Sequence, residues 1–134
     1  ADLINGGGGA DRLFGNGGGD VLSGRGGADR LYGVLGADTL KGGGGDDLIE
    51  IGPGEDIASG GAGADVFIIR TSSETATITD FQNGVDLIAF YQADKFADLV
   101  INQDGAGAVL SAGGSSVLLE GISPSQLSEN DFIF

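Results

Sequence analysis

Eight aspartates stand nine residues apart in the first half of the chain, and this spacing constrains the fold more than any other feature. They are Asp2, Asp11, Asp20, Asp29, Asp38, Asp47, Asp56 and Asp65. Two residues after each of them stands an apolar residue, and these are Ile4, Leu13, Leu22, Leu31, Leu40, Ile49, Ala58 and Phe67. A fixed period of this kind indicates a repeat architecture, in which each unit buries its apolar residue against neighbouring units.

Each nonapeptide combines a glycine-rich run with one carboxylate, as in residues 6–11 and 60–65. Glycine reaches backbone conformations closed to other residues, so these runs can turn tightly and aim their carbonyl groups inward. Carbonyls and carboxylates together form an all-oxygen ligand set, which suits Ca²⁺ with about six to eight oxygen ligands. The three residues after each aspartate fit a short strand whose middle side chain points to the opposite face from its neighbours. The repeats therefore predict calcium-binding turns that alternate with short strands.

The repeats resemble the RTX (repeats-in-toxin) family, whose unit reads G-G-x-G-x-D-x-U-x with U a large aliphatic residue. The resemblance implies an all-β fold, a right-handed parallel β-roll with two nonapeptides per turn and calcium between loops stacked one turn apart. One edge would stack the loops ending at Asp11, Asp29, Asp47 and Asp65. The other edge would stack those ending at Asp20, Asp38 and Asp56, together with Asp2 from a truncated repeat.

The same resemblance implies which groups would hold about five or six calcium ions. The carboxylates would be those of Asp11, Asp20, Asp29, Asp38, Asp47, Asp56 and Asp65, with Asp2 as a further candidate. The backbone carbonyls would be those of Gly7, Gly9, Asn16, Gly18, Arg25, Gly27, Gly36, Gly45 and Gly54. Two loops depart from the unit, because Val34 replaces its second glycine and Ile51 its first.

After Phe67 the glycines thin out and a different pattern begins. Strands are predicted at residues 66–69, 75–78, 86–90, 99–101, 108–110 and 116–119. Asp104-Gly105 and Gly113-Gly114 favour hairpin turns. Because a solenoid needs caps at its open ends, we expect a roll over residues 1–68 and an antiparallel β cap over residues 69–134.

Two segments of the second half resemble known sequences. Residues 78–88 resemble the I-x-D-F-x-x-G-x-D-x-I segment that follows the roll in serralysin-type proteases and in the R-modules of mannuronan C5-epimerases. Asp80 and Asp86 would bind one further calcium there, or alternatively serve as turn and capping carboxylates. Residues 129–134 resemble the acidic-then-apolar tail that type I (ABC) exporters read in the RTX family. The alternative for this tail is a final strand, and the two interpretations are compatible.

The charge of the chain favours a cation as its ligand. The sequence has 20 acidic and 6 basic residues, a net charge of −14, which argues against nucleic acid and anionic membranes as partners. With neither cysteine nor histidine, the usual structural zinc sites and His-based catalytic triads are excluded. No apolar run approaches the roughly eighteen residues that span a bilayer.

We therefore expect a secreted, extracellular calcium-binding module without a catalytic site of its own. The inner walls of the roll are thin and its carboxylates repel one another, so metal would supply much of its stability. Because Ala1 begins in mid-repeat, we expect a C-terminal fragment that supports the export, folding and stability of an upstream catalytic or adhesive domain. The type I export machinery would be its other partner.

The outer surface of the roll suggests an alternative function. Arg12, Phe14, Arg30 and Tyr32 flank buried leucines and should face outward, with the arginines side by side and the rings side by side one turn apart. Such a surface could bind an acidic, alginate-like polysaccharide, with guanidinium groups on carboxylates and rings on sugar faces. It could equally pack against the cap or the parent domain.

Overall fold

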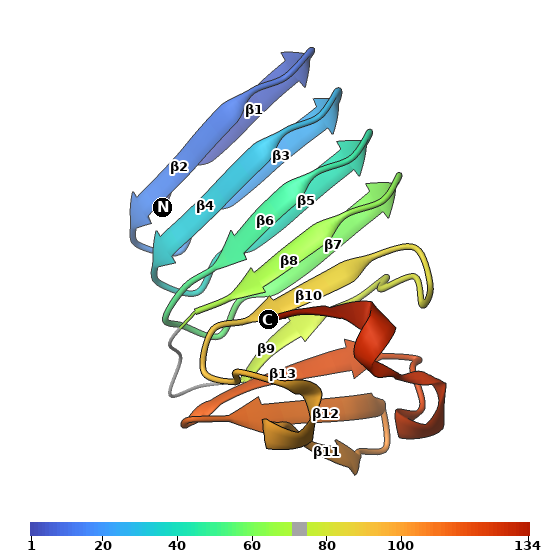
Figure 1. The fold of residues 1–134 in the computed structure, drawn as a ribbon. Helices are drawn as coiled ribbons and strands as arrows, with labels where there is room; N and C mark the ends of the chain where they lie inside the picture. The colour runs from blue at the N-terminus through green and yellow to red at the C-terminus, as the bar shows by residue number, and fades with distance from the viewer. Residues whose placement is uncertain (71–74) are drawn as a thin grey trace.

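The structure, a computed structural model, describes residues 1–70 and 75–134, which form an all-β fold built as a solenoid (Figure 1). The first strands in the chain are β1 Leu3–Gly8, β2 Arg12–Gly17, β3 Val21–Gly26, β4 Arg30–Leu35, β5 Thr39–Gly44, β6 Leu48–Ile51, β7 Ile57–Ala62 and β8 Val66–Ile69. The later ones are β9 Thr75–Ile78, β10 Leu87–Phe90, β11 Val100–Gln103, β12 Gly107–Ala112, β13 Ser115–Glu120 and β14 Phe132–Ile133. Three short 3-10 helices lie between them within the described residues, η1 Phe96–Asp98, η2 Pro124–Gln126 and η3 Glu129–Asp131. Residues 1–70 and 75–134 contain no helix that is long and apolar enough to cross a membrane.

Successive strands of the repeats alternate between two parallel sheets. β1, β3, β5 and β7 pair in one sheet, and β2, β4, β6 and β8 pair in the other. Leu13 lies opposite Leu31 and Leu22 opposite Leu40, so partners are 18 residues apart. Two nonapeptides therefore make one turn, which confirms the predicted parallel β-roll.

The parallel ladders continue beyond the repeats. β9 pairs with β7, β10 with β8, and β14 with β10, all in parallel. In the first sheet β13 pairs with β9 in parallel, and β12 and β11 then complete the sheet in antiparallel pairing (Figure 1). The predicted hairpin turns are confirmed, since Asp104-Gly105 joins β11 to β12 and Gly113-Gly114 joins β12 to β13. The division into a roll and a cap at residue 68 stays a prediction, because both sheets run through that point.

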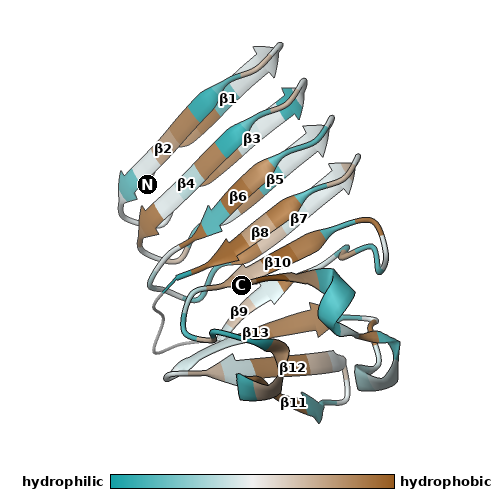
Figure 2. Ribbon diagram, viewed as in Figure 1, coloured by the Kyte–Doolittle hydropathy of each residue, from teal (hydrophilic) through white to brown (hydrophobic). Residues whose placement is uncertain are grey.

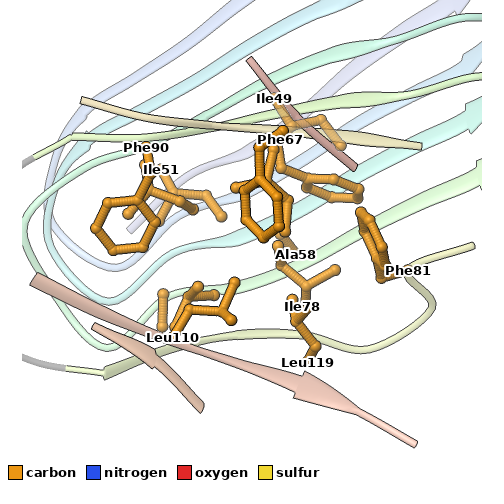
Figure 3. Close-up of a cluster of buried hydrophobic side chains, with 14 of the residues drawn as sticks. Ile49, Ile51, Ala58, Phe67, Ile78, Phe81, Phe90, Leu110 and Leu119 are labelled. Carbon is orange, nitrogen blue, oxygen red and sulfur yellow. The ribbon is translucent and has the colours of Figure 1, made fainter. Parts of the chain in front are cut away.

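The core between the sheets is thin in the first turns and thicker in the later ones. In β3, β4 and β5 a single large side chain per strand points inward, and Leu22, Leu31 and Leu40 are fully buried. In the second sheet β6, β8 and β10 each bury two, such as Ile49 with Ile51 in β6. Figure 2 shows the matching rise in hydrophobic colour along β6, β8 and β10, and Figure 3 shows the side chains that fill this end of the roll. The inner walls predicted from the repeat are therefore present, and the apolar content grows toward the C-terminus.

The C-terminal tail forms the edge of the second sheet. η3 positions Asp131, and β14 then pairs with β10, with Phe132 opposite Ile88. The buried carboxylate of Asp131 accepts hydrogen bonds from the backbone amides of Gly84 at 3.1 Å and Ser128 at 2.8 Å. A final strand, the second interpretation of this tail, is confirmed.

Candidate metal centre

The loops between strands stack along two edges of the roll. We call the stack of loops 6–11, 24–29, 42–47 and 60–65 the Asp11 edge. We call the stack of loops 15–20, 33–38 and 51–56 the Asp20 edge. These are the two groups that the resemblance implied, and the register of 18 residues confirms them.

A hydrogen bond links each aspartate of the repeats to the next one on its edge. On the Asp11 edge, the amides of Asp11, Asp29 and Asp47 donate to Oδ1 of the aspartate one turn later, at 2.8, 2.7 and 2.9 Å. On the Asp20 edge, the amides of Asp2, Asp20 and Asp38 do the same at 2.6, 2.8 and 2.8 Å. One carboxylate oxygen per aspartate thus holds two turns together.

The other carboxylate oxygen, Oδ2, faces the interior of its own loop. Among the described residues, Oδ2 is buried without a hydrogen-bond partner in Asp11, Asp20, Asp29, Asp38, Asp47 and Asp65. A Cβ atom added to Gly6 would lie 2.6 Å from Oδ2 of Asp11, and one added to Gly33 would lie 2.7 Å from Oδ2 of Asp38. Burying a carboxylate oxygen without a partner is costly, and a bound cation would offset this cost.

Carbonyl groups of the following turn converge on the same places. A Cβ on Gly24 would contact Oδ2 of Asp29 and lie 2.7 Å from the carbonyl oxygen of Gly42. The same position at Gly15 is 3.0 Å from Oδ2 of Asp20 and 2.7 Å from the carbonyl oxygen of Gly33. Each such glycine therefore leaves room for oxygens of two successive turns, and this donor set fits Ca²⁺, whose oxygen ligands lie at about 2.3–2.6 Å.

These first-position glycines were missed by the sequence reasoning, which named carbonyls at the second and fourth positions. The signal was present, because glycine opens every loop of the two edges except 51–56. A side chain there would clash with a carboxylate, which is why the position accepts only glycine wherever the oxygens converge.

The fourth position of each loop is a glycine with a left-handed backbone, and Gly9, Gly18, Gly27, Gly36, Gly45 and Gly54 all have positive φ. The carbonyl oxygen of Gly18 packs directly against Gly36, so successive turns approach too closely for a side chain. At the second position Gly7 has φ of 112°, and Asn16, Arg25 and Val34 have φ of 70°, 78° and 77° without being glycine. The loop with Val34 thus adopts the common backbone despite its departure from the unit, at a cost in strain.

Four of the buried aspartates have a raised pKa. Burial raises the pKa of Asp38, of Asp47 and of Asp86, and it raises the pKa of Asp65 to about 6. The backbone hydrogen bond from the preceding turn opposes this rise, and neighbouring carboxylates, such as Asp86 beside Asp65, add to it. The stack therefore disfavours its own negative charge unless a cation compensates.

Asp80 and Asp86 close the Asp11 edge through hydrogen bonds. Asp80 accepts from the amides of Gly60 and Gly61, both at 2.9 Å. Asp86 accepts from the amides of Asp65 at 3.0 Å and Gln82 at 2.8 Å. This geometry matches the capping interpretation, and calcium binding by these two residues stays a prediction.

A metal held by this structure depends on backbone groups. Over the described residues, no three acidic side chains gather around one point. Each loop instead contributes one carboxylate from its repeat aspartate, so carbonyl oxygens must complete any coordination shell.

The predicted surface ladder is also present. The rings of Phe14 and Tyr32 stack with centroids 4.6 Å apart and planes 7° apart. The guanidinium of Arg12 lies 5.3 Å from the ring centre of Phe14 and 5.5 Å from that of Tyr32, and Arg30 is the strand partner of Arg12.

Comparison with known proteins agrees with this geometry. Residues 1–22, 23–58 and 50–68 match the family model of the RTX calcium-binding nonapeptide repeat, in four copies. Among curated proteins, none matches the chain significantly.

Two solved structures share the fold. The solution structure of the AlgE6R3 subunit from the Azotobacter vinelandii mannuronan C5-epimerase is 27% identical with a TM-score of 0.56, over 94% of this chain and 78% of that one. The crystal structure of the extracellular lipase LipA from Serratia marcescens is 15% identical with a TM-score of 0.51, over 94% of this chain and 38% of the lipase.

Proposed function

Because the chain belongs to the family of RTX calcium-binding nonapeptide repeats, we propose that it is the calcium-binding module of a secreted protein and folds when it binds calcium outside the cell. The observation that carries this proposal is the row of buried Oδ2 atoms without a hydrogen-bond partner, which stands on both edges. Calcium bound between successive loops neutralises these carboxylates and removes the repulsion within each stack.

Each ion takes its ligands from two turns. One loop supplies Oδ2 of its aspartate, and the next supplies the carbonyl of its first residue, as Asp29 and Gly42 would. Carbonyls of the second and fourth positions, such as Gly7, Gly9, Asn16, Gly18, Arg25, Gly27, Gly36 and Gly45, complete the shell. The positive φ of these residues supports this assignment, because it distinguishes the loop backbone from that of the flanking strands.

The energetic effect follows from the number of sites. A site with Kd near 10⁻⁴ M gains about 1.4 kcal/mol from 1 mM free calcium. Several sites together approach the roughly 5–15 kcal/mol that stabilises an ordinary domain. At micromolar calcium the gain almost vanishes, so the first turns stay unfolded before export.

Circular dichroism and amide hydrogen exchange, first in EGTA and then in millimolar Ca²⁺, test the proposal. We expect the protection of β1 to β5, and the increase in β signal that accompanies it, to appear only with calcium. Magnesium is the control, since it prefers a tighter octahedral shell and sheds water reluctantly, and it should not replace calcium. Full protection of β1 to β5 in EGTA would refute the proposal.

Export and support of an upstream catalytic or adhesive domain form the cellular part of the proposal. The likeness to a subunit of an epimerase supports a role as one module of a larger protein. The acidic-then-apolar tail at 129–134 supports recognition by a type I exporter. A passenger domain fused ahead of residue 1 should reach the medium of cells that carry such an exporter. Deletion of residues 129–134 should retain it inside, and unchanged export of this deletion would exclude the tail as the signal.

Binding of an acidic polysaccharide is the second candidate function, favoured by the ladder of Arg12, Arg30, Phe14 and Tyr32. Two facts oppose it, because Arg12 already lies over both rings and the net charge of −14 repels a polyanion. Calorimetry with oligouronates and the calcium-loaded module at low salt separates the two. Heat that is lost in Arg12→Ala but kept in Lys41→Ala, on the other sheet, supports the sugar site, and no heat in the wild-type excludes it.

A further inference from the structure

We infer that the row of calcium ions along the Asp20 edge stops before Ile51. In the later turns of the fold, apolar side chains fill the equivalent space. This inference rests on the proposed calcium binding and specifies where the ions lie. We call the space between two successive loops of one edge an interval. The four loops of the Asp11 edge enclose three intervals, and loops 15–20 and 33–38 of the Asp20 edge enclose one. The chain accordingly binds about four ions, fewer than the number that the repeats imply.

The strand pairing is interrupted between the first positions of successive loops, and this also holds for Gly33 and Ile51, since β4 pairs with β6 only as far as Tyr32 with Glu50. Pairing in the first turns skips the first-position glycines, because Asn5 pairs with Ser23 and Gly7 with Arg25, which leaves out Gly6 and Gly24. The same omission occurs at Gly24 with Gly42, at Gly42 with Gly60, and at Gly15 with Gly33. At three of these glycines, a carbonyl of the next turn and an aspartate Oδ2 share the space of a missing Cβ, and they are Gly15, Gly24 and Gly42.

Ile51 occupies the equivalent position in the third loop of the Asp20 edge and behaves differently. It pairs with Ile69 of the following turn, and its carbonyl accepts a hydrogen bond from the amide of Arg70 at 3.3 Å. Gly52 also lacks the positive φ found at the second position of the other loops.

In the later turns, apolar side chains occupy the positions that glycines hold in the second sheet and aspartates hold in the first. In the second sheet, the position held by Gly15 and Gly33 in the first turns is held by Ile51, Ile69 and Phe90 in the later ones. These three residues are paired in register and about 1% exposed. In the first sheet, the position that the aspartates of the Asp20 edge hold is taken after Asp56 by Ala76, which is in register with it. Val117 and then Leu110 occupy the same position in the next two strands. All three are buried.

The two apolar lines meet inside the roll. Figure 3 shows Ile51, Phe90 and Leu110 around the same interior space. An isoleucine side chain offers no oxygen to an ion, and the space that oxygens line in the first turns is filled by carbon here. The Asp11 edge shows no such change, because Asp80 and Asp86 continue it with carboxylates.

A matched pair of substitutions tests the inference. Asp38 on the Asp20 edge and Asp47 on the Asp11 edge are both 2% exposed, and both accept the amide of the aspartate one turn earlier. Asparagine keeps the accepting Oδ1 and replaces only Oδ2 with a donor. We expect Asp47→Asn to lose one bound ion and Asp38→Asn to lose none, counted by native mass spectrometry with Ca²⁺ as the metal.

The wild-type count and a mapping experiment complete the test. About four ions, with calcium-induced amide protection in loops 24–29 and 42–47 but not in loop 51–56, support the inference even if a variant fails to fold. Five or more ions, or an ion lost from Asp38→Asn, overturn it while leaving calcium binding intact. No bound calcium in the wild-type overturns the proposed function itself.

Discussion

The backbone amide of Asp29 donates a hydrogen bond of 2.7 Å to Oδ1 of Asp47, the aspartate one turn later on the same edge. Oδ2 of Asp47 faces its own loop, where a Cβ on Gly42 would contact it. The two oxygens of one carboxylate therefore have separate tasks, one in joining turns and one toward the interior. This separation allows the structural and metal-related effects of a single aspartate to be measured independently.

The first prediction compares a middle aspartate with a terminal one. Asp29 accepts the amide of Asp11 and adjoins two intervals of its edge, whereas Asp11 ends the stack. Asp29→Ala should raise the calcium midpoint of folding more than Asp11→Ala, because it also leaves the Asp11 amide without its charged acceptor, a loss of about 1.5–3 kcal/mol. Calcium titration followed by circular dichroism measures both. Equal midpoints would contradict the stacking of ions along the edge.

The second prediction concerns pH. Since burial raises the pKa of Asp65 to about 6, well above its ordinary 3.8, the folded state holds this proton more tightly than the unfolded chain. In EGTA this contribution to stability is complete below about pH 4 and is lost as the pH rises through about 6. Thermal unfolding in EGTA should therefore show a higher Tm at pH 5 than at pH 7. In millimolar calcium the order should reverse, because protons then compete with the metal.

The third prediction tests the close approach of successive loops. Gly27 has φ of 115°, and its Cα packs against the carbonyl oxygen of Gly9, whereas a Cβ on Gly26 would meet nothing within 4 Å. Gly27→Ala should destabilise the calcium-loaded fold by at least the 1–3 kcal/mol, roughly, of a strained backbone conformation. Gly26→Ala, the neighbouring control, should change the stability by less than about 1 kcal/mol. Denaturant unfolding in calcium would show this difference, and similar losses in the two variants would argue against the packing.

The fourth prediction separates the folding role of the tail from its recognition. Asp131 is 3% exposed and accepts the amides of Gly84 and Ser128, while Glu129 is exposed. Asp131→Ala leaves these two amides without their acceptor and should cost about 2–4 kcal/mol of stability in calcium. Glu129→Ala should be nearly neutral for stability. If thermal unfolding finds the two variants equally stable, the tail is not anchored through Asp131.

The periodic part of the fold could be predicted from sequence because its information is local. Every nonapeptide repeats the same turn and strand, so the spacing of Asp11, Asp20 and Asp29 determines the pitch of the roll and the membership of each edge. The hairpins at Asp104-Gly105 and Gly113-Gly114 were accessible for the same reason, since two residues specify each turn.

What the sequence did not reveal depends on contacts between distant residues. Phe132 pairs with Ile88, 44 residues earlier, and no periodic spacing in the sequence predicts this pairing. The salt bridge of Arg70 with Glu50 at 2.8 Å joins residues in neighbouring turns after the repeat has faded. Ile51 was noticed only as a missing glycine, because its meaning depends on Ile69 and Phe90 packing above it.

The chain of aspartate hydrogen bonds has a direction. Every amide that donates comes earlier in the sequence than the carboxylate that accepts it, from Asp2 with Asp20 to Asp65 with Asp86. A chain leaving the ribosome N-terminus first therefore presents donors long before their acceptors exist. Each turn therefore completes these hydrogen bonds only when the turn after it has been made, and beyond the repeats Asp86 completes that of Asp65.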